Sequence, residues 1–426
     1  MAVDSPARIA ILGGGPIGLE AAIYARYLGY DVDVYERGRV AEHLLQWGHL
    51  QLYTPSGSVV SPLGAAALAA HDANWKLPDA GSLLTGRQLA ECYYLPLAQT
   101  DLLVDSIHLS TEVLAVARGN LLKGELAGEE RAEADFRLLL DSSAAPTPAG
   151  DSMSESPPSD SPPAAHKVGQ RVAAADVVID ATGTFGRHNW LGAGGLPALG
   201  ELAAESHIEY GLPAVLARDR ADYAHRHTLV IGSGHSAAAT VTALAQLGHE
   251  APYTRITWLV RRELEAGAGP IRRIADDPWP GRDRLAERAN QLVAGELGHL
   301  TLLSGTTVEE VLWQGGLEQF HVRLGGRQPA LLEVDRIVAN VGYRPDSRLY
   351  AELQVAEDPR DAAPTSWGKL PPEAGCLPTP EPDFYVLGAK SVGRDSRFTI
   401  AEGLTQVRLL FTILGDRPGL NLYKSA

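Results

Sequence analysis

Near its start, the chain alternates apolar and polar positions in the order of a βαβ unit. Residues 8–12 are an apolar run followed directly by glycines, and 31–36 alternate between apolar and polar side chains, which predicts two strands. Between them Leu19, Ala22 and Ile23 have helical spacing, and Gly29 can end the helix. Because crossover connections are right-handed, we expect the two strands to be parallel.

The same order of elements returns about two hundred residues later. Residues 227–232 predict a strand, 235–247 a helix and 255–262 a second strand. Such a repeat indicates a duplicated architecture. We therefore expect an α/β fold with two Rossmann-like, three-layer (ββα) dinucleotide-binding domains, the second inserted in the first. The expected first domain comprises residues 1–210 and 346–426, and the second comprises 211–345.

The rest of the pattern fills in these domains. Residues 43–64 have no clean period and predict a loop with short pieces of structure. The expected helices cover 86–100, interrupted at Pro96, then 283–297 and 400–414. The expected strands form an antiparallel hairpin at 111–118 and 135–141, and others lie at 176–183, within 300–313, and at 320–326, 335–343 and 383–390.

A stretch rich in serine, proline and alanine interrupts the first domain. Of the 24 residues 142–165, 18 are Ser, Pro or Ala and none is aromatic. Such a composition buries too little apolar surface to offset the entropy of ordering. We expect a disordered insertion at about 142–166 within a hairpin connection, and a partner-binding segment is the alternative.

Composition and charge narrow the functional classes. The chain has 426 residues, 45% of them hydrophobic, and a net charge of −15, which disfavours nucleic acid or an anionic membrane as the main partner. No signal peptide and no apolar run of membrane-spanning length is visible, so we expect a cytoplasmic protein. Its two cysteines, Cys92 and Cys376, form no CxxC pair, which excludes a local dithiol mechanism. We expect each to be a small, buried, apolar side chain. We expect no metal site.

The first glycine turn follows the first strand directly. In Gly13-x-Gly15-x-x-Gly18, the first glycine permits the tight turn, the second lets the backbone approach a pyrophosphate, and the third permits close packing of helix and strand. Glu36 ends the next strand, where a carboxylate can accept hydrogen bonds from a ribose diol. These features predict a dinucleotide site that suits FAD or NAD. The alternative is a glycine-rich turn that serves packing alone.

The second turn is Gly232-x-Gly234-x-x-Ala237, and the strand after it ends in Arg261 and Arg262. Because a guanidinium pairs bidentately with a phosphate, these arginines favour NADPH over NADH. The alternative is two solvated arginines. His235 and Ser236 begin the helix. We expect them to cap it, which is the more frequent role of such residues, and the alternative is contact with phosphate or nicotinamide.

Two nucleotide units, with an acid after the first and arginines after the second, resemble the two-dinucleotide-binding flavoproteins. This superfamily includes glutathione- and thioredoxin-reductase-like enzymes and the flavin-containing monooxygenases. "VVIDATGTFG" (177–186) is similar to its ATG strand end, and "IVANVGYRP" (337–345) to the corresponding strand end of the NADPH domain. "FYVLGAKSVGR" (384–394) falls where the family has a late GD motif at the flavin ribityl chain.

The resemblance also implies that Val113 holds adenine by its backbone and that the helix from about Thr399 points its positive end at the flavin. Together, motifs and resemblance give the expected cofactor contacts. For FAD these are Gly13, Gly15, Pro16, Ile17, Gly18, Glu36, Arg37, Trp47, Val113, Thr182, Gly183, Gly388, Ala389 and Lys390; for NADPH they are Gly232, Ser233, Gly234, His235, Ser236, Arg261, Arg262 and Gly342.

The chain departs from the family pattern at two points. The late motif lacks its usual Asp, because the sequence there is Gly388-Ala389-Lys390, and the redox disulfide of the reductase branches is absent. The absence of the disulfide favours the monooxygenases, which need no protein redox group. Their FxGxxxH motif has a degenerate match at 196–211, with Gly200 and His207. The segments 46–55 and 388–398 also resemble flavoproteins of arsenic-resistance operons.

The resemblance implies an FAD-dependent, NADPH-consuming monooxygenase, in which a C4a-(hydro)peroxyflavin transfers one oxygen of O₂ to a small-molecule substrate. The flavin supplies the chemistry, so no catalytic side chain is predicted. The alternatives are an NADPH:acceptor oxidoreductase with a quinone, metal or small-protein acceptor, and a flavin-binding sensor or interaction protein. Lys390 is expected to contact the flavin or ribityl chain, or to be a solvated loop lysine. Candidates for the substrate pocket, with a core role as the alternative for the aromatic ones, are Gln46, Trp47, His49, Tyr53, Arg272, Arg273 and Trp279.

Overall fold

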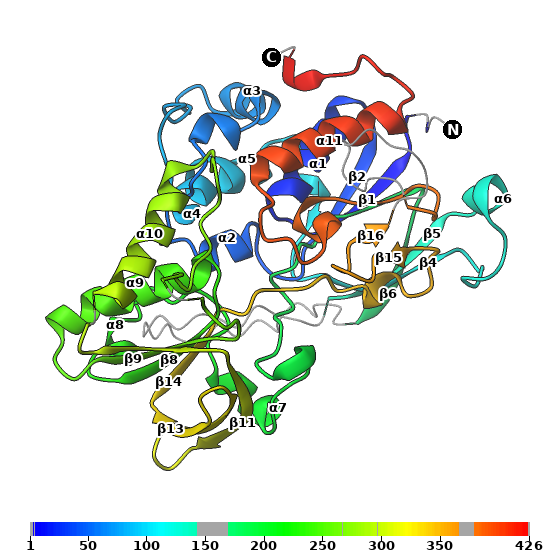
Figure 1. Cartoon of the computed structure of the whole chain (residues 1–426). Helices are drawn as coiled ribbons and strands as arrows, with labels where there is room; N and C mark the ends of the chain where they lie inside the picture. The colour runs from blue at the N-terminus through cyan, green and yellow to red at the C-terminus, as the bar shows by residue number, and fades with distance from the viewer. Residues whose placement is uncertain are drawn as a thin grey trace, which may run out of the picture. The chain divides into compact units, whose positions relative to one another are not determined.

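A computed structural model describes residues 3, 5–142, 169–265, 267–295, 297–365 and 379–424. The chain divides into two compact units (Figure 1). The first unit comprises Met1–Leu45, Pro55–Gly186 and Pro345–Ala426, and the second comprises Gln46–Thr54 and Arg187–Arg344. Two segments therefore fall in the second unit although the sequence assigned them to the first domain, namely 46–54 and 187–210. The expected insertion at 142–166 lies, apart from its first residue, outside the described residues.

The first unit is built on a parallel sheet of five strands in the order β17-β7-β1-β2-β3. Strand β1 is central, since Ile9 pairs with Val32 on one side and with Val177 on the other. This pairing confirms the parallel βαβ unit expected from the sequence. The strands are β1 (Arg8–Leu12), β2 (Asp31–Tyr35), β3 (Ile107–His108), β7 (Val177–Asp180) and β17 (Phe384–Val386).

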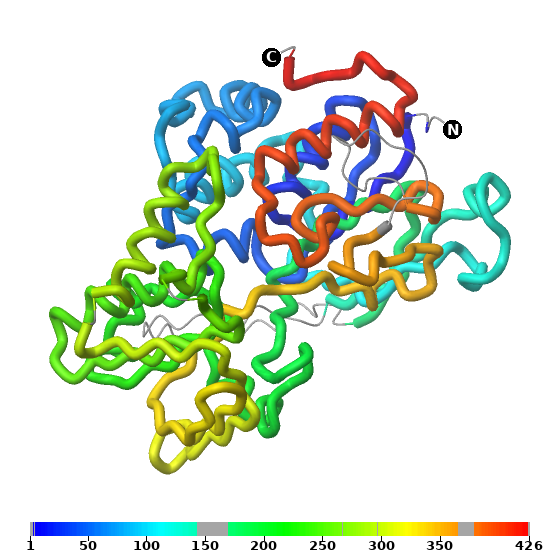
Figure 2. The backbone as a smooth tube through the Cα atoms, viewed as in Figure 1, coloured from blue at the N-terminus to red at the C-terminus, as the bar shows by residue number. Residues whose placement is uncertain are grey.

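Two helices from opposite ends of the chain pack together in this unit, α1 (Pro16–Tyr27) and α11 (Ile400–Leu414). The rings of Tyr24 and Phe411 stack with their centroids 5.0 Å apart. Figure 2 shows the first and last parts of the chain, in blue and red, side by side here. The other α-helices in the described part of this unit are α2 (Glu42–Gln46), whose last residue falls in the second unit, α3 (Pro62–His71), α4 (Gly86–Leu89), α5 (Leu95–Ala98) and α6 (Gly128–Ala132).

An antiparallel sheet, β4-β5-β6, forms a further layer of the first unit. Along β5 every second residue is buried, and Phe136, Leu138 and Leu140 share one core with Leu12 and Val178 of the parallel sheet. Burying one side of β5 against the parallel strands fixes its register, because a one-residue shift would expose these side chains. The strands are β4 (Glu112–Arg118), β5 (Phe136–Asp141) and β6 (Gln170–Ala175). A short pair, β15 (Ala356–Glu357) and β16 (Pro364–Thr365), forms a separate two-stranded sheet.

The second unit repeats this layering around a parallel sheet in the order β10-β9-β8-β14. On its central strand, Val230 packs with the helices, whereas Leu229 and Ile231 pack against the antiparallel sheet β11-β12-β13. The duplicated architecture is thereby confirmed. Its elements are β8 (His227–Ile231), α9 (His235–Glu250), β9 (Arg255–Val260), α10 (Pro280–Ala294), β10 (Leu300–Ser304), β11 (Thr306–Gln314), β12 (Gln319–Gly326), β13 (Ala330–Val334) and β14 (Arg336–Ala339), with the short helices α7 (Glu201–Ala204) and α8 (Arg220–Tyr223) before them.

The helix predicted at 86–100 contains a wide π-helical turn, Ala90–Tyr94, between α4 and α5. Pro96 has no N–H to donate, and its ring would clash with the carbonyl four residues earlier, on Cys92. That carbonyl instead accepts a hydrogen bond of 2.9 Å from the indole N–H of Trp75. The proline therefore widens the helix rather than ending it.

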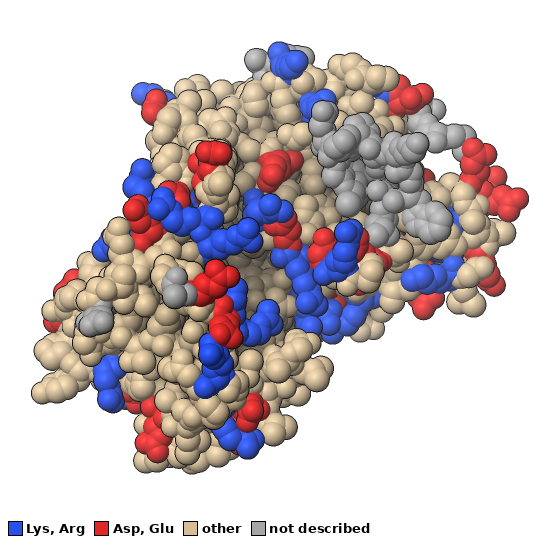
Figure 3. Space-filling view, viewed as in Figure 1, with Lys and Arg blue, Asp and Glu red and all other residues tan. Residues whose placement is uncertain are grey.

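Both signs of charge are interspersed over the face seen in Figure 3. Within the described part of the chain, no helix is both long and apolar enough to cross a membrane. Cys92 is partly buried rather than fully buried, and Cys376 lies outside the described residues.

Candidate functional site

The first glycine turn has no room for other side chains at two of its three glycines. Gly13 has φ +102°, and a Cβ there would lie 2.8 Å from the carbonyl oxygen of Ala181. A Cβ on Gly18 would overlap the carbonyl oxygen of Gly13. The turn therefore packs against the end of β7 on one side and against its own helix on the other.

Gly15 is different, because a Cβ there would meet no atom within 4 Å. It is the N-cap residue of α1, and no side chain caps that helix. Pro16 occupies the first turn, where its missing N–H costs nothing. Among the described residues, this helix end therefore has no capping side chain and has free space beside Gly15, which suits the binding of a phosphate. The turn fits the pyrophosphate of a dinucleotide.

Glu36 directly follows β2 and is tied to this turn. Its Oε2 accepts a hydrogen bond of 2.7 Å from the backbone N–H of Gly14, and its Oε1 accepts one of 2.8 Å from Gly38. Each oxygen retains a further lone pair, so the carboxylate can still accept hydrogen bonds from a ribose diol. Arg37, the next residue, lies against Gly186, where an added Cβ would come within 2.8 Å of its Nη2.

At the end of β7, a buried ion pair supports the turn that contains Thr182 and Gly183. The Lys390 ammonium lies 2.5 Å from Oδ2 of Asp180, and these side chains are 1% and 0% exposed. The alternative of a solvated loop lysine was therefore wrong. Asp180 also accepts hydrogen bonds at Oδ1 from the hydroxyl and the backbone N–H of Thr182, at 2.6 Å and 3.0 Å. Asp180 lies within the ATG-like motif, but its role was not predicted from the sequence.

The loop Gly388–Val392 beside this pair is hydrogen-bonded to helix α11. The backbone N–H of Gly388 donates to Oε1 of Gln406 on α11 at 2.8 Å, and the amide of Gln406 donates to the hydroxyl of Ser391. Helix α11 starts as expected after Thr399, which forms a capping box with Glu402. Ala389 lies within this loop, and Val113 lies in β4 opposite Leu140 of β5.

The second glycine turn repeats the geometry of the first. Gly232 has φ +139°, and a Cβ there would overlap the carbonyl oxygen of Asn340, at the end of β14. A Cβ on Gly234, the N-cap residue of α9, would meet nothing within 4 Å. The indole N–H of Trp258 donates to the carbonyl of Gly232 at 2.8 Å. Trp258 and Asn340 thus hold this turn, and neither was picked out from the sequence.

The expected capping by His235 or Ser236 was wrong. Helix α9 begins at His235, so Gly234 takes the N-cap position, and no side chain caps the helix. Burial and the nearby Arg282 lower the pKa of His235, which favours its neutral form near pH 7. The helix end is left open to an anion, as in the first unit.

The arginines after β9 lie slightly beyond the position of Glu36. Gly13 donates its N–H to the carbonyl of Tyr35, and Gly232 donates its N–H to that of Leu259. Val260 therefore corresponds to Glu36, and Arg261 and Arg262 follow it. Both arginines are exposed, and Arg262 donates to the carbonyl of Pro270 at 3.5 Å.

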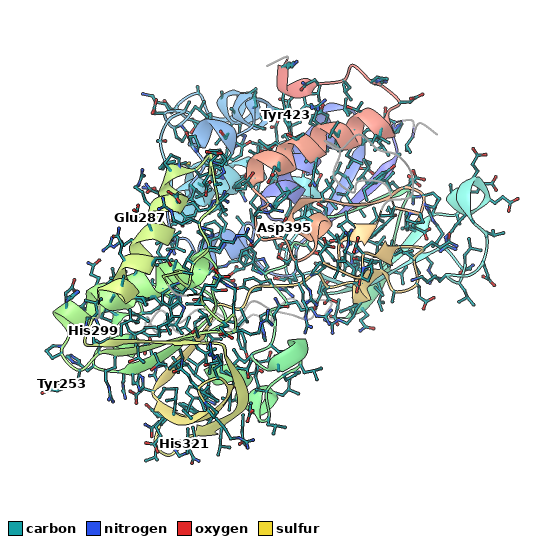
Figure 4. The ribbon with its side chains drawn as sticks, viewed as in Figure 1. Tyr253, Glu287, His299, His321, Asp395 and Tyr423 are labelled. Atoms are coloured by element: carbon teal, nitrogen blue, oxygen red, sulfur yellow. The ribbon has the colours of Figure 1, made fainter. Side chains whose placement is uncertain are left out.

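All the candidates for the substrate pocket, those at 46–54 and those at 272–279, belong to the second unit. The ring of Tyr53 packs on Gly281 at the start of α10, where an added Cβ would lie 3.3 Å from it. The indole N–H of Trp47 is buried and has no hydrogen-bond partner among the described residues. Arg273 pairs with Asp283 at 2.5 Å and lies 3.8 Å from Glu287, labelled on α10 in Figure 4. The structure brings Tyr53 to α10, and it ties Arg273 to acids of that helix.

The degenerate FxGxxxH residues have structural roles in the second unit. Gly200 has φ +78°, and a Cβ there would overlap the carbonyl oxygen of Val311 in β11. The ring of His207 stacks on Trp313, with the centroids 4.4 Å apart. Among the described residues, no cluster of His, Cys, Asp and Glu could hold a metal ion.

No model of a known protein family matches the sequence, and no curated protein matches it. Solved structures do match over nearly the whole chain. The bacillithiol disulfide reductase Bdr (YpdA) from Bacillus cereus has a TM-score of 0.66 at 17% identity, covering 96% of this chain and 99% of its own. The thioredoxin reductase from T. acidophilum has a TM-score of 0.54 at 16% identity, covering 95% of this chain and 97% of its own.

A monooxygenase is among these neighbours. DfoA, the cadaverine monooxygenase of desferrioxamine biosynthesis from Erwinia amylovora, solved with bound FAD, has a TM-score of 0.63 at 12% identity, covering 97% of this chain and 95% of its own. At such identities the likeness shows the fold. The chain therefore has the fold of the two-dinucleotide-binding flavoproteins, with a second Rossmann-like domain inserted in the first.

Proposed function

We propose that this protein is an FAD-dependent, NADPH-consuming oxidoreductase that acts as a monooxygenase on a small molecule, with O₂ as its co-substrate. FAD is assigned to the glycine turn of the first unit and NADPH to that of the second. The observation that carries the proposal is the pair of open helix N-termini, at Gly15 and Gly234, where an added Cβ would meet nothing. Each suits a pyrophosphate, and two such sites in one chain suit an electron donor and its acceptor.

The protein's residues bind and orient the cofactors. FAD, when bound, supplies the redox chemistry. Glu36 offers its remaining lone pairs to the adenosine ribose, and the N-terminus of α1 stabilises the pyrophosphate charge. In the second unit, α9 does the same for NADPH, and the exposed Arg261 and Arg262 are available to its 2′-phosphate.

The preference for oxygen transfer rests on the cysteines and on one neighbour. Cys92 and Cys376 are the two cysteines of the chain, and they are far apart in the sequence. A dithiol relay of the CxxC type is therefore not available. DfoA, of similar fold, is a cadaverine monooxygenase.

A second candidate is an NADPH:acceptor oxidoreductase, in which electrons leave the flavin for a quinone, a metal centre, a disulfide or a small protein. It is favoured by the reductases of similar fold, a bacillithiol disulfide reductase and a thioredoxin reductase.

Two matched variants test the cofactor assignment. Gly15→Ala and Gly234→Ala add a methyl group where the folded chain has room, so both proteins should keep the wild-type melting temperature without cofactor. Gly15→Ala should lose FAD. Gly234→Ala should bind FAD, while NADPH should no longer reduce it in an anaerobic stopped-flow experiment. If Gly234→Ala is reduced as fast as the wild type, the assignment of NADPH to the second turn fails.

The fate of the electrons is tested with the reduced wild-type protein. We expect its flavin to be reoxidised by O₂ within seconds and slowly by ubiquinone, ferricyanide or a disulfide under nitrogen. Fast anaerobic reoxidation by one of these acceptors, together with slow reaction with O₂, would instead establish the acceptor oxidoreductase.

A further inference from the structure

Lys390, two residues after the glycine of the late motif, is buried inside the first unit, although it was expected to contact the flavin or the ribityl chain. Lys390 is 1% exposed and presents almost no surface to a ligand. Its ammonium pairs with Asp180, donates to the hydroxyl of Thr182 at 3.2 Å, and lies 4.9 Å from the ring centre of Tyr350. The ammonium of Lys390 is therefore bonded to side chains of the protein itself.

An ammonium in such a place is costly unless its partners fix it, because both charges of the pair have left water. Here the partners converge on one exposed residue, Thr182. The Thr182 hydroxyl donates to Asp180 and accepts from Lys390, and the backbone N–H of Thr182 also donates to Asp180. The two buried charges thus fix both the side chain and the backbone of Thr182.

The turn that contains Thr182 packs directly against the first glycine turn. A Cβ on Gly13 would lie 2.8 Å from the carbonyl oxygen of Ala181 and 3.1 Å from Cα of Thr182. The N–H of Ala181 donates to the carbonyl of Leu12, the last residue of β1. A shift of Thr182 would therefore displace Gly13, and with it the open end of α1 at Gly15.

We propose that Lys390 and Asp180 are positioning residues for the FAD site, which act through Thr182 to hold the first glycine turn in its phosphate-binding shape. This inference rests on the proposed function, since it concerns the same FAD site. It adds that the affinity for FAD depends on a buried pair that a ligand does not reach.

The test compares FAD dissociation constants of flavin-free protein, measured by quenching of FAD fluorescence. Thr182→Val removes a hydroxyl that bonds to both buried charges, so the protein should fold with a somewhat lower melting temperature, as the control variant Arg131→Met also should. Thr182→Val should bind FAD roughly tenfold more weakly, because the turn is no longer held in shape for binding. Thr182→Ser keeps the hydroxyl and should bind within about twofold of the wild type. If Val and Ser variants bind FAD equally, the proposal is overturned.

Lys390→Met tests the route through Thr182. It should weaken FAD binding by roughly tenfold and change the visible circular dichroism of the bound flavin. In the Thr182→Val background the same substitution should have little further effect, since residues that act through one contact are not additive. Fully additive effects would overturn the proposal. If Lys390→Met does not fold, the Val and Ser pair still decides.

Arg131→Met is the control for general destabilisation of the first unit. Arg131 is buried, pairs with Glu381 at 2.8 Å and forms no hydrogen bond with the glycine turn. The Arg131→Met substitution should lower the melting temperature and leave the FAD dissociation constant unchanged. If the wild type and this control both fail to bind FAD, the proposed function fails. If both bind FAD while Lys390→Met and Thr182→Val bind it equally well, this inference alone fails.

Discussion

At the scale of single residues, the two units differ most where the strand after each glycine turn ends. In the first unit, the carboxylate of Glu36 accepts hydrogen bonds from the backbone N–H groups of Gly14 and Gly38. These bonds fix the carboxylate beside the turn. The corresponding Val260 in the second unit is buried and offers no acceptor. The next residues, Arg261 and Arg262, are exposed cations. This difference favours a bare ribose in the first unit and a phosphorylated one in the second.

We expect the double variant Arg261→Ala/Arg262→Ala to raise KM for NADPH by roughly ten- to a hundredfold, because a hydrogen bond to a charged group contributes about 1.5–3 kcal/mol. KM for NADH should be unchanged. Steady-state NADPH and NADH oxidation at low and moderate salt measures both. Arg323→Ala on β12, an exposed arginine 3.1 Å from Glu310, serves as the control. An equal rise for both coenzymes would contradict the assignment of the 2′-phosphate to these arginines.

At the scale of elements, a buried carboxylate on α1 links this helix to the π-helical turn, to α3 and to the C-terminal segment. Glu20 of α1 is 0% exposed. Its Oε1 accepts a hydrogen bond of 2.6 Å from Tyr93 in the π-helical turn, and its Oε2 lies 3.4 Å from the hydroxyl of Tyr423, labelled in Figure 4. The hydroxyl of Tyr93 also lies 3.1 Å from that of Ser61, which caps α3. The C-terminal segment and α3 thus meet α1 at one ionisable group.

Burial raises the pKa of Glu20 to about 7, against the opposing effect of its hydrogen bonds to Tyr93, Ser61 and Tyr423. The folded state thus holds this proton more tightly than the unfolded chain. Its contribution to stability is complete below about pH 4.5, declines as the pH rises to about 7, and is lost above that. Glu20→Gln removes this dependence.

We therefore expect the difference in free energy of unfolding, Glu20→Gln minus wild type, to be about 2–3 kcal/mol larger at pH 8 than at pH 5, so the variant is relatively more stable at pH 8. Urea denaturation of both proteins at the two pH values measures it. The comparison of the two proteins cancels the titration of other groups. The same difference at both pH values would show that Glu20 is already ionised in the folded protein at pH 5.

At the scale of the whole molecule, the chain crosses between its units without breaking either core, and each unit has its own parallel sheet, helices and antiparallel sheet. The segment 143–168 is flanked by residues that lie side by side, because Asp141 of β5 pairs with Gln170 of β6. Its removal should therefore leave both cores intact.

We predict that replacing residues 143–168 by a two-residue Asn-Gly turn leaves FAD binding unchanged. The free energy of unfolding should stay the same or rise by up to about 2 kcal/mol, because a shorter loop costs less entropy to close. Urea denaturation and FAD titration of the shortened chain test this. A marked loss of stability would mean that the segment contributes to the fold.

Much of this architecture could be predicted from sequence because its signals are local. The strands that flank both glycine turns, the helices after them and the antiparallel pair at β4 and β5 lie where apolar periodicity placed them. Helix α3 was missed because its Ala-rich, almost uniformly apolar sequence has no amphipathic period. Helix α10 starts at Pro280, slightly earlier than expected, since a proline is well tolerated in a first turn.

The sequence by itself determined the two glycine turns, because a glycine needed for a positive φ or a close backbone approach leaves its mark at a fixed spacing. Only the tertiary structure decided what supports them. Lys390 and Asp180 are 210 residues apart in sequence, and nothing local to either predicts their pairing. Whether a charged side chain is a solvated loop residue or a buried support depends on which distant strand ends lie beside it, and folding alone brings these together.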